Sequence, residues 1–121
     1  MQTPRDAMLM RIFIGENDRH SHRPLYEAIV QEARAHHLAG ATVLRGPMGF
    51  GHSSRLHTAK ILRLSEDLPI VVEIVDDEDK IGAFLPVLDA MMNSGLVTLA
   101  RVQALRYGDE SPAAAAAEGG E

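Results

Sequence analysis

The sequence predicts an α+β protein in which two helices cover one face of an antiparallel sheet. Apolar, β-prone segments recur along the chain, at residues 8–14, 41–44, 69–75 and 96–105. Between the first two segments, and again between the last two, apolar residues recur at the three- and four-residue spacing of a helix. The resulting order, β-α-β-loop-β-α-β, is that of the split βαβ or ferredoxin-like sandwich, with a long loop between strands two and three.

The first half of the chain supplies one strand, one helix and the strand that leads to the loop. Residues 8–14 form an apolar run that ends at a turn-rich cluster, which predicts a buried strand. Pro24 is placed to begin a helix, and apolar residues continue at helical spacing as far as Leu38. Gly40 then provides a stop signal. The β-prone residues 41–44 lead directly into the loop.

The second half repeats the pattern. Residues 69–75 are rich in β-branched side chains, which predicts a strand at the centre of the sheet. Four carboxylates at residues 76–79 complement the dipole of a helix that begins there. Pro86 falls inside this helix and predicts a kink or a local break. Residues 93–95 end the helix, and residues 96–105 form the last strand.

The strand at residues 69–75 carries apolar side chains on both of its faces. Ile70, Val72 and Ile74 alternate with Val71 and Val75, and successive side chains of a strand point to opposite sides. Helices cover only one face of the predicted sheet. The excess of apolar side chains therefore predicts self-association, most simply through packed sheet faces.

Length and composition narrow the class of protein. The chain has 121 residues, no cysteine and a formal net charge of −5. We therefore expect one domain at residues 1–110, without disulfides, thiol catalysis or thiolate metal sites. We expect no nucleic-acid partner, because cations are not concentrated along the chain. No apolar run approaches the roughly 18 residues that span a bilayer, so we expect a cytoplasmic protein that is not membrane-embedded. The Ala- and Gly-rich residues 111–121 are expected to form a disordered tail.

The loop at residues 46–60 is the main candidate for a functional site. Its glycines let backbone N–H groups approach a ligand, and its cationic side chains suit an anion, most simply a phosphate. The candidate effector-binding residues are Arg45, Gly46, Gly49, Phe50, Gly51, His52, Ser53, Arg55 and Lys60, with Glu16 and Arg101 from other strands. Alternatives stay open: Glu16 accepts a ribose hydroxyl or only closes a turn, Phe50 stacks on a base or packs into a neighbouring subunit, and the loop is a ligand site or a plain surface hairpin.

The histidines support a second interpretation. His22, His52 and His57 would form a divalent-metal site if a subunit boundary brought them together, because histidine is the commonest metal ligand. No strong metal motif such as His-Glu-x-x-His occurs. Ser53 lies beside His52, but acyl transfer also needs an orienting third group, and none follows from the sequence. We therefore expect no enzyme and no required cofactor.

Several stretches of the chain resemble PII-like signalling proteins. Residues 40–51, which contain Gly-Phe-Gly, resemble the second strand of these proteins and the base of their signalling loop. Residues 68–78 resemble the third strand and the acidic start of the second helix, and residues 96–108 resemble the last strand and its exit. The match is nearest to a small PII-like family of unassigned function in bacteria and archaea, through the further stretches 11–16, 24–29 and 52–57.

The resemblance implies a homotrimeric regulator that binds a small anionic effector, usually an adenine nucleotide, in the clefts between subunits. Gly49, Phe50, Gly51 and His52 would then lie where PII proteins hold the nucleotide. The loop would change conformation with the ligand and meet a partner, often a membrane transporter, a channel or a metabolic enzyme. The alternative is a divalent-metal-binding trimer, in the manner of cation-tolerance proteins of similar fold.

Overall fold

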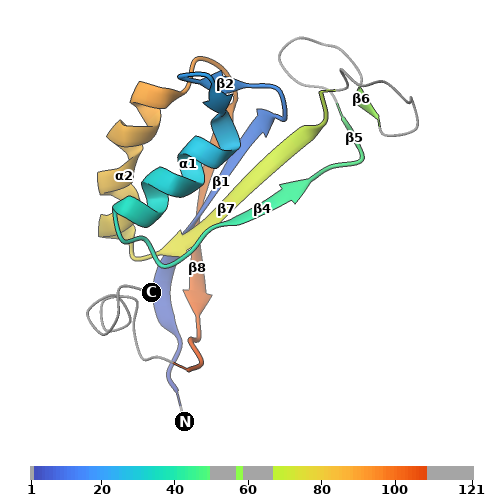
Figure 1. Cartoon of the computed structure of the whole chain (residues 1–121). Coiled ribbons are helices and arrows are strands. Elements are labelled where there is room, and N and C mark those ends of the chain that lie inside the picture. Colours follow the sequence, from blue (N-terminus) through green and yellow to red (C-terminus); the bar gives the residue numbers. More distant parts are fainter. Residues whose placement is uncertain (1, 50–56, 59–66, 109–121) are drawn as a thin grey trace.

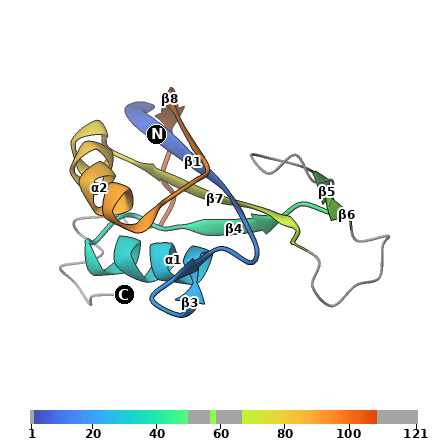
Figure 2. The same ribbon diagram turned by 90° about the horizontal axis from the view of Figure 1, so that it is seen from above.

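A computed structural model describes residues 2–49, 57–58 and 67–108. In this part of the chain, helices α1 (Leu25–Ala35) and α2 (Glu78–Met91) lie side by side over one face of a sheet, as Figures 1 and 2 show. The predicted α+β, ferredoxin-like sandwich is confirmed. The tail expected at residues 111–121 lies outside the described residues.

The sheet has the strand order β4 (Thr42–Arg45), β7 (Pro69–Asp76), β1 (Arg5–Gly15) and β8 (Leu96–Ala104). Every neighbouring pair is antiparallel. The β-branched strand predicted for the centre is β7, and it does lie inside the sheet, between β4 and β1. Among the described residues, none of the helices is long and apolar enough to cross a membrane.

The hydrophobic core lies between the sheet and the helices. In antiparallel strands, residues directly opposite one another point to the same face, and the register sets Ile12 between Val72 and Val97 on the covered face. Ile12 and Val72 are fully buried. The other buried apolar residues are Met8, Met10, Ile14, Leu25, Ala28, Ile29, Ala33, Ile70, Ile74, Ile81, Phe84, Leu88 and Met91.

The first helix ends earlier than predicted. It stops at Ala35, and Gly40 is not its stop signal. His37 instead adopts the left-handed conformation, with φ of 62°. The N–H of His37 donates to the Arg34 carbonyl and that of Leu38 donates to the Ala33 carbonyl, each at 3.0 Å. These bonds form the closing turn that a glycine usually supplies.

The second helix runs without interruption from Glu78 to Met91, so the break predicted at Pro86 does not occur. Pro86 lies on the exposed side of α2, while Ile81, Phe84 and Leu88 are buried beneath it. The apolar contacts of these side chains hold the helix across a position where one backbone hydrogen bond is missing.

Two short strand pairs lie outside the main sheet. A hairpin of β2 (Arg19–His20) and β3 (Arg23–Pro24), which the sequence did not predict, precedes α1. Its turn residues, Ser21 and His22, have φ of 52° and 68°. A second pair, β5 (Met48–Gly49) and β6 (His57–Thr58), lies beyond the end of β4, away from the helices (Figure 1).

One buried carboxylate ties two connections together. Asp76, at the end of β7, is 3% exposed. Its Oδ2 accepts a hydrogen bond from the N–H of Ala39 at 2.8 Å, and its Oδ1 accepts one from the N–H of Asp77 at 2.7 Å. The carboxylate therefore anchors both the segment after α1 and the start of α2.

Candidate functional site at the base of the loop

The start of the loop lies against Pro69, the first residue of β7. The N–H of Gly46 donates to the Pro69 carbonyl at 2.8 Å. A Cβ atom added at Gly46 would lie 2.9 Å from the Pro69 Cγ, and one added at Gly49 would lie 3.1 Å from the same atom. The loop therefore leaves the sheet in direct contact with the proline ring, and only glycine allows this approach without a shift.

An ion pair stands beside these glycines. Arg45 ends β4 and Glu16 follows β1, and the Arg45 Nη2 lies 2.9 Å from the Glu16 Oε2. The N–H of Glu16 donates to the Leu68 carbonyl at 2.8 Å, which fixes the backbone of Glu16 next to β7. Both side chains are partly exposed, at 47% and 30%. A bound anion would therefore compete with Glu16 for the same guanidinium.

The turn after β1 is held by two carboxylates. The Asp67 Oδ1 accepts a hydrogen bond from the N–H of Asn17 at 2.8 Å. The Asp18 Oδ2 accepts one from the N–H of Gly15 at 2.9 Å. Sequence reasoning did not select Asp67 or Asp18, although each stands in a turn-prone cluster next to a predicted strand, nor Pro69, which begins the predicted strand at residues 69–75. The hydrogen bonds of Asp67 and Asp18 fix the backbone on both sides of Glu16.

Part of the predicted site is brought together here and part is not described. Strands β5 and β6 pair Met48 with Thr58 and Gly49 with His57, so the first residues of the loop meet residues further along it. The other predicted loop residues lie outside the described ranges: Phe50, Gly51, His52, Ser53, Arg55 and Lys60.

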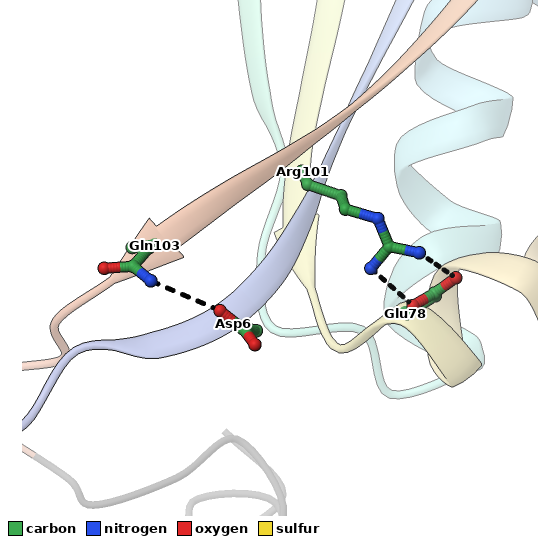
Figure 3. A network of polar contacts seen from close by, with 4 residues as sticks. All are labelled: Asp6, Glu78, Arg101 and Gln103. Carbon is green, nitrogen blue, oxygen red and sulfur yellow. Dashed lines mark hydrogen bonds and ion pairs between the residues drawn. The ribbon is translucent and has the colours of Figure 1, made fainter.

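Arg101 lies at the opposite end of the sheet from Arg45. It pairs in register with Met8, near the start of β1, whereas Arg45 pairs with Ile70, near the start of the antiparallel strand β7. Its guanidinium donates to both carboxylate oxygens of Glu78, at 3.1 and 3.3 Å (Figure 3). A single chain does not bring Arg101 to the base of the loop.

Sequence reasoning also missed a pocket at this opposite end, lined by both charged and apolar residues. Its volume is about 360 Å³. Of the residues that line it, Arg5 lies 3.5 Å from the Asp77 carboxylate, and Asp6 accepts a hydrogen bond at 3.3 Å from the amide of Gln103, which is not itself part of the lining (Figure 3). Further lining residues are Gln2, Ala7, Val75, Asp76, Ala104, Leu105, Arg106 and Tyr107. The sequence features that could have indicated this pocket are two adjacent pairs of charged residues. They are Arg5-Asp6 at the start of β1 and Asp76-Asp77 at the end of β7.

The histidine alternative gains no support from the residues that the structure describes. No group of three or more histidine, aspartate or glutamate side chains within 2–49, 57–58 and 67–108 is placed to hold a metal ion. His22 is exposed at the tip of the hairpin that precedes α1. His52 lies outside the described ranges, and only the backbone of His57 is placed.

The fold is similar to that of PII-like proteins. CPII, a nitrogen regulatory PII-like protein from Thiomonas intermedia K12 solved with ADP, AMP and bicarbonate, aligns with a TM-score of 0.61 at 18% identity, over 86% of this chain and 92% of its own. A putative PII-like signaling protein from Thermus thermophilus aligns with a TM-score of 0.62 at 16% identity, over 86% and 94%. At these identities the likeness concerns the fold alone.

The sequence comparison identifies the family. The chain belongs to the DUF190 family, described as "Uncharacterized ACR, COG1993", whose model matches residues 7–104. A UPF0166 protein of Aquifex aeolicus (strain VF5) is 37% identical over 97 residues, which are 80% of this chain and 91% of that protein. The resemblance of the sequence to a PII-like family of unassigned function is thereby confirmed.

Proposed function

We propose that this protein is a PII-like regulator: a homotrimer that binds a small anionic effector, an adenine nucleotide, in the clefts between subunits. The base of the loop supports this proposal most directly. Arg45, Gly46 and Gly49 stand together at the end of the sheet, where one guanidinium and a closely packed, glycine-rich backbone face the loop. A guanidinium group suits phosphate oxygens, and the absence of side chains at the two glycines lets a ligand approach the backbone closely.

The Arg45–Glu16 pair suggests how a ligand would act on the loop. With the site empty, Glu16 neutralises Arg45 and holds the end of β4 to the turn after β1. A phosphate group would compete for the guanidinium and favour a loop conformation in which Arg45 contacts the ligand. The ligand then shifts the population of loop conformations, because it contacts one of them better than the others.

A site that includes Arg101 would have to lie between subunits. Arg45 and Arg101 lie at opposite ends of the sheet in one chain, so only a second copy could bring both cations to one ligand. The uncovered face of the sheet, which carries apolar side chains from β1, β4, β7 and β8, offers a surface for such assembly. The loop would then present the state of the site to a transporter, a channel or a metabolic enzyme.

A thermal-shift screen of the purified full chain tests the class of ligand. ATP, ADP, AMP, cyclic nucleotides and divalent metals are each added over a range of concentrations. A ligand present at about one hundred times its dissociation constant stabilises the folded state by about 2.7 kcal/mol, so we expect a clear rise in Tm with an adenine nucleotide. A rise with metals alone would favour the histidine interpretation and contradict the proposal.

Two substitutions at the base of the loop test the mechanism. Arg45→Ala should weaken nucleotide affinity about tenfold, because a charge-assisted hydrogen bond is lost. Glu16→Gln should strengthen it, because the competing carboxylate is removed. Isothermal titration calorimetry measures both, with the exposed Arg34→Ala in α1 as the control that should bind like the wild type.

The two variants separate the alternatives for Glu16. Weaker binding by Glu16→Gln would show that Glu16 contacts the ligand, as in the ribose interpretation, and would overturn the competition mechanism. The double change Arg55→Ala with Lys60→Ala examines the remaining cations of the loop. Unchanged affinity in that variant would show that these two side chains do not hold the phosphate.

A further inference from the structure

A polar row crosses the middle of the open face of the sheet, which the helices leave uncovered. The register sets Thr42 opposite Glu73, Glu73 opposite Arg11, and Arg11 opposite Thr98. Residues opposite one another in antiparallel strands share a face. Each of the four strands therefore contributes one polar side chain to a continuous row, which we call the polar row.

Apolar rows flank the polar row on both sides. One consists of Leu44, Val71, Phe13 and Leu96, and the other contains Val75, Leu9 and Ala100. Leu44, Val75 and Leu96 are 45%, 38% and 58% exposed. Rows on one face are two residues apart along the strands, a spacing of about 7 Å.

The centre of the polar row is a formed ion pair. The Arg11 Nε donates to the Glu73 Oε2 at 3.0 Å. The guanidinium carbon also lies 5.3 Å from the centre of the Phe13 ring, so the charge leans over the neighbouring apolar row. The side chains of Arg11 and Glu73 are still 41% and 31% exposed. Any molecule that covers the face would complete their burial.

Burial constrains what can cover this face. Removing an ion pair from water is unfavourable for each ion unless the pair and its remaining hydrogen bonds stay satisfied. The flanking rows need apolar partners, and the polar row needs polar partners at the same spacing of about 7 Å. Other copies of the open face meet both needs, because each carries the same three rows and equal numbers of positive and negative charges in the middle one.

We propose that the polar row, through its Arg11–Glu73 pair, fixes the register in which copies of this chain pack their open faces. The inference rests on the self-association in the proposed function and assigns its specificity to named residues. Packings that set an apolar row over the ion pair leave buried charges without polar partners, whereas packings that align the polar rows keep each pair intact. The polar row thus selects one assembly among those that the apolar rows alone would allow.

Native mass spectrometry and light scattering of the full chain over a dilution series test this inference. Arg11→Glu sets two carboxylates side by side in the face and should raise the dissociation constant of the assembly by about 30-fold or more. The exchange Arg11→Glu with Glu73→Arg restores a pair in the same row and should recover most of the affinity. Arg34→Glu makes the same change of charge on the exposed side of α1 and should assemble like the wild type.

The outcomes separate this inference from the proposed function. A wild-type chain that stays monomeric at every concentration would contradict self-association itself. A wild-type assembly that Arg11→Glu leaves unchanged, or that the exchange fails to restore, would overturn the role of the polar row alone.

A variant without charge covers the case in which Arg11→Glu does not fold, as judged by circular dichroism. Arg11→Met with Glu73→Met keeps the side chains long and makes the middle of the face apolar. We expect a mixture of assembly sizes from this variant in place of one. A single size with wild-type affinity would contradict the inference.

Discussion

The two faces of the sheet use the same strands in different ways. On the covered face, β1 and β7 present apolar residues from Met8 to Ile14 and from Ile70 to Ile74, of which Met10, Ile12, Ile70 and Val72 are fully buried. On the open face, the same two strands place Arg11 and Glu73 between apolar rows. The centre of a face that closes within one chain can be wholly apolar, whereas a face that meets another molecule also needs a feature that specifies register. Ile12 and Arg11 are neighbours in the sequence, but Ile12 is buried on the covered face and Arg11 lies on the open face.

The test of this contrast with the largest expected effect introduces a carboxylate on each face of the sheet in turn. Ile74 is 1% exposed and its neighbour Val75 is 38% exposed. Ile74→Asp buries an unpaired charge, at a cost of several kcal/mol against a total stability of about 5–15 kcal/mol, and should prevent folding. Val75→Asp should fold and lose self-association. Circular dichroism and light scattering measure the two effects, and a folded, fully assembled Val75→Asp would contradict the assignment of the open face.

A milder test removes the same side chain from adjacent positions. Val72→Ala on the covered face should lower the free energy of unfolding by about 2 kcal/mol, through lost burial and a small cavity. This change should not depend on protein concentration. Val71→Ala on the open face should instead show a loss that fades on dilution, because the contacts that it removes lie between copies. Urea denaturation at two protein concentrations distinguishes the two variants. If their losses of stability depended equally on protein concentration, the assignment of Val72 to the covered face and Val71 to the open face would be contradicted.

The test with the smallest expected effect stabilises α2, one of the two helices that cover the buried face. Gly82 is exposed in α2, and an added Cβ would have no atom within 4 Å. Gly82→Ala should raise the free energy of unfolding by about 0.5–1 kcal/mol, because alanine loses less backbone entropy in a helix. Gly40→Ala, at an exposed non-helical position that is equally uncrowded, is the control and should change stability less. Self-association should be the same in both variants, and a change in the Gly82 variant would show that α2 contributes to it.

The sequence predicted most of the sandwich because its signals are periodic. The alternation in residues 69–75 predicted both a central strand and two apolar faces, and β7 occupies an inner position of the sheet. The end of the first helix was predicted wrongly because His37 adopts a conformation usually left to glycine. The hairpin before α1 was missed for the same reason, since Ser21 and His22 form its turn with positive φ.

The candidate site was only partly predictable because its contacts join distant residues. Arg45 and Glu16 were each selected from the sequence, but nothing in it shows that their side chains form an ion pair with each other. The contact of Gly46 with Pro69 depends on the register of β4 and β7. Arg101 was grouped with Arg45 by residue type, and topology sets the two at opposite ends of the sheet.

Asp76 gives the far end of the sheet a cooperative behaviour. Its single carboxylate accepts the amides of Ala39 and Asp77, and a buried carboxylate that loses either partner is left poorly solvated. Local opening of the segment after α1 therefore destabilises the start of α2, and the reverse holds equally. Two connections that are remote in sequence then fray or stay closed together, as one unit of local unfolding.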